Sequence, residues 1–151
     1  MAKFQVGPGM DKYLSQLQNL EFQADDMIGR AIYKGAGIVA DAIKANIQAL
    51  PSSACSAVEK EGLINGFGIS KMREENGYFN VKAGFSKNNK DVTKKFPHGK
   101  PNSMIARSIE GGTSFRPKHP FVGPAVRATK DKAEQAMAEE IDKNIKSTMG
   151  V

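Results

Sequence analysis

The stretch from Met27 to Leu50 restricts the possible fold more than any other part of this 151-residue chain. Its apolar side chains recur every three or four residues, which is the period of one face of an α-helix. They are Met27, Ile28, Ala31, Ile32, Gly35, Ile38, Val39, Ala42, Ile43, Ile47 and Leu50. Asp25 and Asp26 lie where a helix N-terminus favours negative charge, and Pro51 ends the run. The pattern predicts an amphipathic helix about 35 Å long, at about 1.5 Å per residue.

Two glycines, Gly35 and Gly37, lie in the middle of this helix. A dinucleotide-binding loop would need a strand before such glycines and a fixed glycine spacing at the start of the helix. Neither is present, so we interpret the glycines as a place where the helix packs closely against another element.

Two shorter elements are expected before the long helix. Residues 3–7, "KFQVG", alternate between apolar and polar side chains, which predicts an edge strand stopped by the following Pro8-Gly9. Asp11 is a suitable N-cap for a first short helix, in which Leu14, Leu17 and Leu20 recur every three residues.

Beyond Pro51 the apolar period changes from helix to strand. Alternating runs flank Asn76-Gly77, a dipeptide that favours a tight β-hairpin turn, so we expect a hairpin over residues 67–85. Residues 103–110, "SMIARSIE", also alternate and predict a third strand. Pro124 suits the first position of a last helix, whose apolar stripe continues to Met149.

These elements together predict an α+β fold. A small antiparallel sheet of about three to four strands would pack against the long helix of the N-terminal half and against the C-terminal helix. The chain has the length of one compact domain, so we expect a single domain over residues 1–151.

The composition argues against several functional classes. No apolar run approaches the about 20 residues of a membrane span, and the N-terminus has no signal-peptide order, so we expect a protein kept in, or assembled from, a cytoplasm. One cysteine, Cys55, and two histidines, His98 and His119, are too few for a typical protein-only zinc site. No catalytic triad or pair of titratable groups is visible, and we expect neither enzymatic activity nor a cofactor.

Positive charge is concentrated in the middle of the chain. Residues 81–132 carry 12 basic and 3 acidic side chains, which leaves +9, whereas the whole chain carries +6. Residues 86–102, "SKNNKDVTKKFPHGKPN", form the centre of this region and are expected to be a long, mobile, functional loop, which we call the basic loop. The excess predicts contact with a polyanion such as nucleic acid, or else a solvated loop that maintains solubility.

A segment after residue 108 resembles a known family. Ile109, Glu110, Gly112 and Thr113, followed by Pro120, Phe121, Pro124 and Ala125 and then a helix, are similar to a motif in neck proteins of long-tailed (siphovirus-like) phages and prophages. These are the tail-completion proteins, or tail components, of the gene-product-ten type. The order of the long early helix, the hairpin and this motif also agrees. Gly111 departs from the pattern, because the family usually has an aromatic residue there.

The resemblance implies a structural virion protein of the head–tail junction. Such proteins form an oligomeric ring between the head-side connector and the tail terminator, join the tail to the head, and surround the path of double-stranded DNA. Assembly would take place in the cytoplasm of the bacterial host. The alternative from a different class is a free cytoplasmic nucleic-acid-binding protein that uses the same lysines.

Candidate residues follow from the charge and from the motif. For contact with DNA or a partner we expect Lys87, Lys90, Lys94, Lys95 and Lys100, and for contact between subunits Arg107, Glu110, Arg116 and Lys118. For Glu110, capping of a neighbouring backbone and pairing with Arg107 or Arg116 are also open. Gly112, Thr113, Pro120, Phe121 and Pro124 are expected to build a rigid turn that leads into the last helix.

Overall fold

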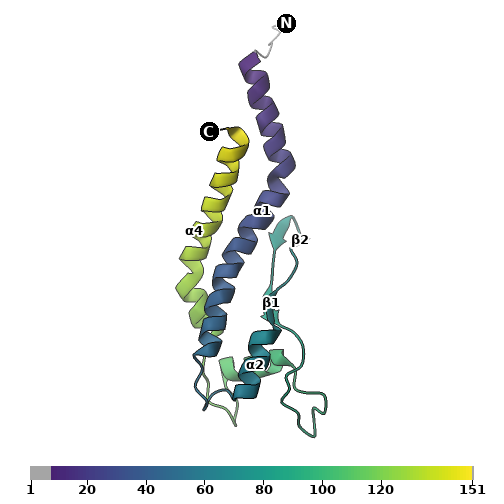
Figure 1. Ribbon diagram of the computed structural model, residues 1–151, viewed down its shortest axis with the longest axis vertical. Coiled ribbons are helices and arrows are strands. Elements are labelled where there is room, and N and C mark those ends of the chain that lie inside the picture. The colour runs from purple at the N-terminus through teal and green to yellow at the C-terminus, as the bar shows by residue number, and fades with distance from the viewer. Residues whose placement is uncertain (1–7, 151) are drawn as a thin grey trace.

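Two long helices dominate the molecule in the computed structural model, which describes residues 8–150 (Figure 1). Helix α1 spans Pro8–Gln48 and helix α4 spans Val122–Met149, and the two run antiparallel. Contacts along the whole pair fix this direction: the Gln16 side chain donates to the Met149 carbonyl, Lys34 pairs with Glu140, and the Asn46 side chain donates to the Phe121 carbonyl. The predicted long helix and C-terminal helix are therefore confirmed.

The predicted break between a first and a second helix is wrong, because α1 is continuous through residues 21–26. The apolar face of the long helix continues backwards through Ala24, Leu20 and Leu17 with the same period, and nothing between these residues interrupts a helix. Asp11 consequently lies in the first turn of α1 and does not cap it. The strand expected over residues 3–7 lies outside the described residues.

Close packing at Gly35, predicted from the sequence, is confirmed. A Cβ atom at this position would lie 2.7 Å from Cγ of Met137 on α4, so a larger residue would require Met137 to move. At Gly37 the expectation is wrong, because a Cβ atom there would have no neighbour within 4 Å. The buried Ala31 and Ala133 also keep the two helices near each other. Small residues on both helices therefore set the distance at which α1 and α4 pack.

The predicted hairpin is confirmed, and it consists of two strand pairs. Strand β1 (Phe67–Ile69) pairs with β4 (Ala83–Phe85), and β2 (Arg73–Glu75) pairs with β3 (Tyr78–Asn80), both antiparallel. Asn76 and Gly77 close the turn with φ angles of 55° and 79°, as a two-residue hairpin turn requires. The Tyr33 hydroxyl on α1 accepts a hydrogen bond from Met72 N, so the hairpin lies along α1. The fold is α+β, as expected.

The predicted third strand is wrong, because residues Asn102–Gly111 form helix α3. A short run such as "SMIARSIE" satisfies the strand and the helix period equally well, and tertiary packing decides between them. Here Ile105, Ala106 and Ile109 are buried on one face of α3, which is a helical spacing. Asn102, almost fully buried, ties the start of the helix to the carbonyl oxygen of Ser86.

A further helix, α2 (Ala57–Gly66), was not expected from the sequence. The Ser56 hydroxyl caps it by accepting a hydrogen bond from Glu59 N at 3.2 Å. The largest fully buried apolar side chains are Ile47 on α1, Leu63 on α2, Ile109 on α3 and Phe121, the residue just before α4. They meet in one core at one end of the molecule.

Two regions of the molecule can thus be distinguished. We call the core end, residues 40–69 and 83–129, the base, and the two helices beyond it, residues 8–34 and 134–149, the stalk. Figure 1 shows the basic loop at the base, far from the free ends of α1 and α4. Within the described residues no helix is long and apolar enough to span a membrane.

Candidate interaction surface at the base

Glu110 closes the segment that resembles the phage motif. Its Oε2 accepts hydrogen bonds from Phe121 N at 2.7 Å and Val122 N at 2.9 Å, and its Oε1 accepts one from Gly123 N at 2.9 Å. The carboxylate therefore caps the N-terminus of α4. Burial acts to raise the pKa of Glu110, but the three backbone N–H groups, with Arg127 nearby, outweigh it and lower the pKa. Of the open roles, capping is the one that the structure supports.

The other motif residues shape the turn that brings Glu110 to α4. Gly112 has a φ of 74°, and a Cβ there would lie 2.9 Å from the backbone N of Lys118, so a glycine is required. Phe121 is 1% exposed and packs edge-on against Phe85, with ring centroids 6.2 Å apart. Pro120 is exposed beside it. Pro124 is the third residue of α4 and not the first, because the helix begins at Val122.

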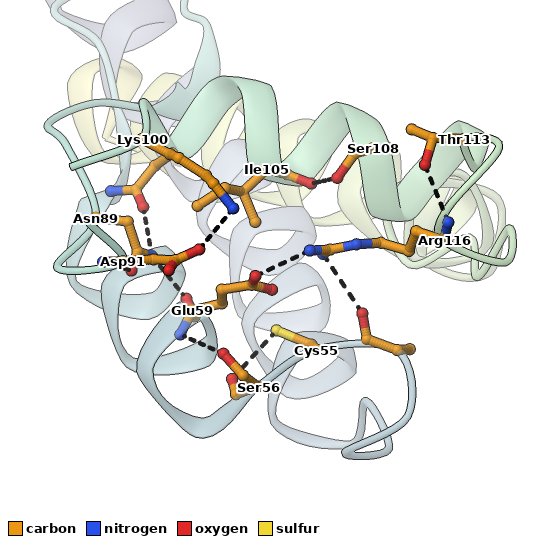
Figure 2. Close-up of polar contacts among 12 residues, drawn as sticks. Cys55, Ser56, Glu59, Asn89, Asp91, Lys100, Ile105, Ser108, Thr113 and Arg116 are labelled. Carbon is orange, nitrogen blue, oxygen red and sulfur yellow. Dashed lines mark hydrogen bonds and ion pairs between the residues drawn. The ribbon is translucent and has the colours of Figure 1, made fainter. Parts of the chain in front are cut away.

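Arg116 is fixed by an ion pair inside the base. Its Nη2 lies 2.8 Å from Glu59 Oε1 on α2, and its Nη1 donates to the Ala54 carbonyl (Figure 2). The Thr113 hydroxyl oxygen accepts hydrogen bonds from the backbone N of Phe115 and of Arg116, which closes a tight turn. The guanidinium expected at a subunit contact is therefore largely used within the subunit, where it holds the 113–116 turn in place.

Cys55 lies in the same polar cluster, next to Glu59, and its side chain is buried. Burial, and after it the negative charge of Glu59, raise the pKa of the Cys55 thiol. This environment is the opposite of one that activates a cysteine nucleophile. Among the described residues, no group of three or more His, Cys, Asp or Glu side chains is arranged to hold a metal ion.

The basic loop is tied to the base by two buried amides. Asn89, 2% exposed, donates from Nδ2 to the Glu59 carbonyl and to Asn102 Oδ1, both at 3.0 Å. Its backbone N donates to the Lys100 carbonyl at 2.7 Å, and the Lys100 ammonium lies 2.8 Å from Asp91. These bonds hold the two ends of the loop together and tie the loop to α2 and α3.

The lysines expected on the loop fall into two groups. Lys87, Lys90, Lys94 and Lys95 are exposed, whereas Lys100 is half-buried in its ion pair with Asp91. Lys94 and Lys95 lie in a turn closed by mutual backbone hydrogen bonds between Thr93 and Phe96. Arg107 on α3, Lys118 before α4, and both histidines are exposed as well. The anchored loop thus carries four exposed lysines within nine residues of the chain.

An open cavity of about 560 Å³ lies between the basic loop, α3 and the 113–116 turn. Its lining consists of Lys95, Lys100, Met104, Ile105, Ser108, Thr113, Phe115 and Arg116. Phe115 is 98% exposed at its edge. Sequence reasoning overlooked this residue, although an aromatic side chain between a Gly-Gly-Thr turn and an Arg-Pro dipeptide is a visible signal.

No family model, no curated protein and no solved structure matches this chain. The resemblance to phage neck proteins therefore stays a prediction from the sequence.

Proposed function

We propose that this protein is a structural component of the head–tail junction of a long-tailed phage. It forms a ring of identical subunits around the DNA path and joins the tail to the head. The observation that carries the proposal is the set of exposed lysines that the anchored basic loop presents at one end of an elongated molecule. The resemblance of residues 109–125 to the neck family, whose turn and cap have a clear structural role here, supports the same conclusion.

The chemistry of the loop fits contact with a DNA backbone. Exposed ammonium groups attract phosphates without reading the base sequence, as a ring around passing DNA requires. The amide anchor of Asn89 keeps the lysines in place without using their charge. A ring also needs two different surfaces on each subunit, because its interfaces join the front of one subunit to the back of the next.

The first test is microscopy of particles from phage that lack this gene. We expect DNA-filled or leaking heads beside unattached tails, because the joint would be missing. Intact infectious particles would contradict the proposal and favour the free nucleic-acid-binding protein.

A second test reverses charge on the loop in the same phage, with Lys87→Glu and Lys90→Glu together. We expect loss of DNA retention, because phosphates would meet carboxylates. The matched control is Lys143→Glu with Lys146→Glu, which reverses two exposed lysines on the stalk. Unchanged DNA retention in the loop variant would show that Lys87 and Lys90 do not contact the DNA. For the free binder, the isolated subunit would instead bind DNA with a steep dependence on salt.

A further inference from the structure

Among the residues that the structure describes, two phenylalanines are exposed almost completely, one on the stalk and one on the base. Phe22 on the stalk is 91% exposed and Phe115 on the base is 98% exposed. An aromatic side chain that gains no burial within its own subunit is a typical anchor for contact with another one. The surroundings of the two rings differ in charge, and this difference identifies the partner.

Three acidic residues lie near Phe22 on helix α1. Asp25 and Asp26 follow it by three and four residues and so lie beside it on the helix surface, and Glu21 precedes it. All three acidic residues are exposed. Asp26 pairs with Arg30 at 3.3 Å, so the patch offers a partner mainly the charges of Glu21 and Asp25. Met27, in contrast, is buried in the fold, so Phe22 lies on a face of α1 that the fold leaves free. This part of α1 therefore presents one aromatic ring within an acidic patch.

The cavity beside Phe115 has the opposite character. Its lining includes the apolar Met104 and Ile105 and the basic Lys95 and Lys100. Lys94, which is exposed, precedes Lys95 in the chain. The walls are already fixed in the single subunit, because Arg116 is held by Glu59 and Lys100 by Asp91 (Figure 2). Its volume of about 560 Å³ is within the range of about 300–1,000 Å³ in which proteins bind whole small molecules, so one aromatic side chain fits.

We propose that the acidic patch around Phe22 of one subunit docks into this cavity of a second copy of the chain. Phe22 lies against Met104 and Phe115, and Glu21 and Asp25 lie near Lys94 and Lys95. The contact joins the stalk of one copy to the base of the next, so it is heterologous. A pair still has one unused acidic patch at one end and one unused cavity at the other, to which further copies can add. This proposal rests on the proposed function, because the contact would be the interface between neighbouring subunits of the ring.

The charges of the two surfaces favour a stalk-to-base contact over a stalk-to-stalk contact and over DNA binding at Phe22. A symmetric pair of stalks would place the carboxylates of two copies against each other, which opposes association. DNA is repelled by the acidic patch and so does not cover Phe22. A contact with a single aromatic anchor is small, and its strength in a pair of free subunits is expected to be modest and sensitive to salt.

The test uses two charge-reversed variants of the full chain. The base variant is Lys94→Glu with Lys95→Glu, and the stalk variant is Glu21→Lys with Asp25→Lys. Association is measured by sedimentation velocity at low salt and again at about 0.5 M salt, where charges are screened beyond a few ångströms. The wild-type chain should associate with rising concentration, and each variant alone should associate at least about tenfold more weakly, because like charges then face each other.

The decisive result comes from mixing the two variants. In an equimolar mixture the acidic base of one faces the basic stalk of the other, and the basic base faces the acidic stalk, so association should return to the wild-type level. A stalk-to-stalk contact would not be weakened in the base variant, and a base-to-base contact would not be weakened in the stalk variant. Weakening in both single variants together with recovery in the mixture therefore identifies a contact between stalk and base. Phe22→Ala should abolish association, whereas Tyr78→Ala, which removes a 76% exposed aromatic ring at the hairpin tip, should leave it unchanged.

Several outcomes would overturn the contact. They are a wild-type chain that stays monomeric at millimolar concentration, a mixture that does not recover, or a Phe22→Ala chain that associates normally with the circular-dichroism spectrum of the wild type. Each is separate from a failure of the proposed function. If the mixture recovers but phage without the gene still form intact particles, the contact stands and the neck assignment fails.

Discussion

The base and the stalk share the two long helices α1 and α4, but they differ in how completely their apolar side chains are buried. In the base, Ile47, Leu63 and Ile109 are fully buried by four helices and a hairpin. In the stalk, α1 and α4 pack mainly against each other, the hairpin contacts α1 near Tyr33, and Ile141, Ile145 and Met149 remain half-buried. Two helices share a single seam and cannot cover an apolar stripe from all sides. The free energy of folding is therefore concentrated in the base, and the stalk has apolar surface left for a neighbour.

The largest expected effect is at Phe121, which packs in the base. Phe121→Ala should lower the free energy of unfolding by about 3–5 kcal/mol, because a fully buried ring is replaced by a cavity. Ile145→Ala in the stalk, which shortens a smaller side chain at a half-buried position, should cost about 1–2 kcal/mol. Urea denaturation followed by far-UV circular dichroism measures both. Equal losses would show that base and stalk are equally well packed.

The next largest effect is expected from the ion pair between Arg116 and Glu59. Arg116→Met should destabilise the base by about 3 kcal/mol, because it leaves the buried Glu59 carboxylate without a partner. The buried thiol of Cys55 lies beside this pair, so its alkylation by iodoacetamide reports opening of the base. We expect labelling to accelerate roughly a hundredfold.

Arg107→Met is the control for this measurement, because Arg107 is exposed on α3. Its labelling rate should equal that of the wild-type chain. If Arg116→Met labels no faster than the control, the pair does not hold the base closed.

A smaller effect with a distinct pH dependence is expected at Glu110. Its pKa is lowered in the folded state, so its contribution to stability is present at neutral pH and is lost as the pH falls below the ordinary glutamate value of about 4.3. Glu110→Gln should cost about 2 kcal/mol at pH 7, because three backbone N–H groups lose a charged acceptor.

Urea denaturation at pH 7 and at several values down to about pH 3 tests this linkage. The difference between the wild-type chain and Glu110→Gln should shrink as the pH falls. Asp142→Asn, at an exposed position of the stalk, should leave the pH dependence almost unchanged. A difference that is constant with pH would mean that the charge of Glu110 does not stabilise α4.

Local patterns predicted those parts of the fold that depend on neighbours in the sequence. The helix from Met27 and the Asn76-Gly77 hairpin were found because period and turn chemistry are local. Asp25 and Asp26 misled, since they lie in the middle of α1 and not at a helix start. Negative charge is favoured at an N-terminus, but it is also tolerated on any exposed face of a helix.

The parts that failed depend on residues far apart in the chain. The sequence pattern of α3 predicts a strand. The contact that fixes the start of the helix, from the Asn102 side chain to the Ser86 carbonyl, joins residues far apart in the chain. In the candidate site, the exposed lysines and the turn before α4 were predicted from composition and motif. The partner of Arg116 was not, because Glu59 lies 57 residues away and no local pattern indicates the pair.

The order of the helices along the chain has a consequence for synthesis. The apolar face of α1 is covered by α4, and about 70 residues separate Gln48 from Val122. At about 5–20 residues per second, a ribosome that has released α1 needs several more seconds to deliver its partner. During that interval the nascent chain carries an uncovered amphipathic helix. This helix is a binding site for a chaperone, and it can aggregate with other nascent chains when many are made at once.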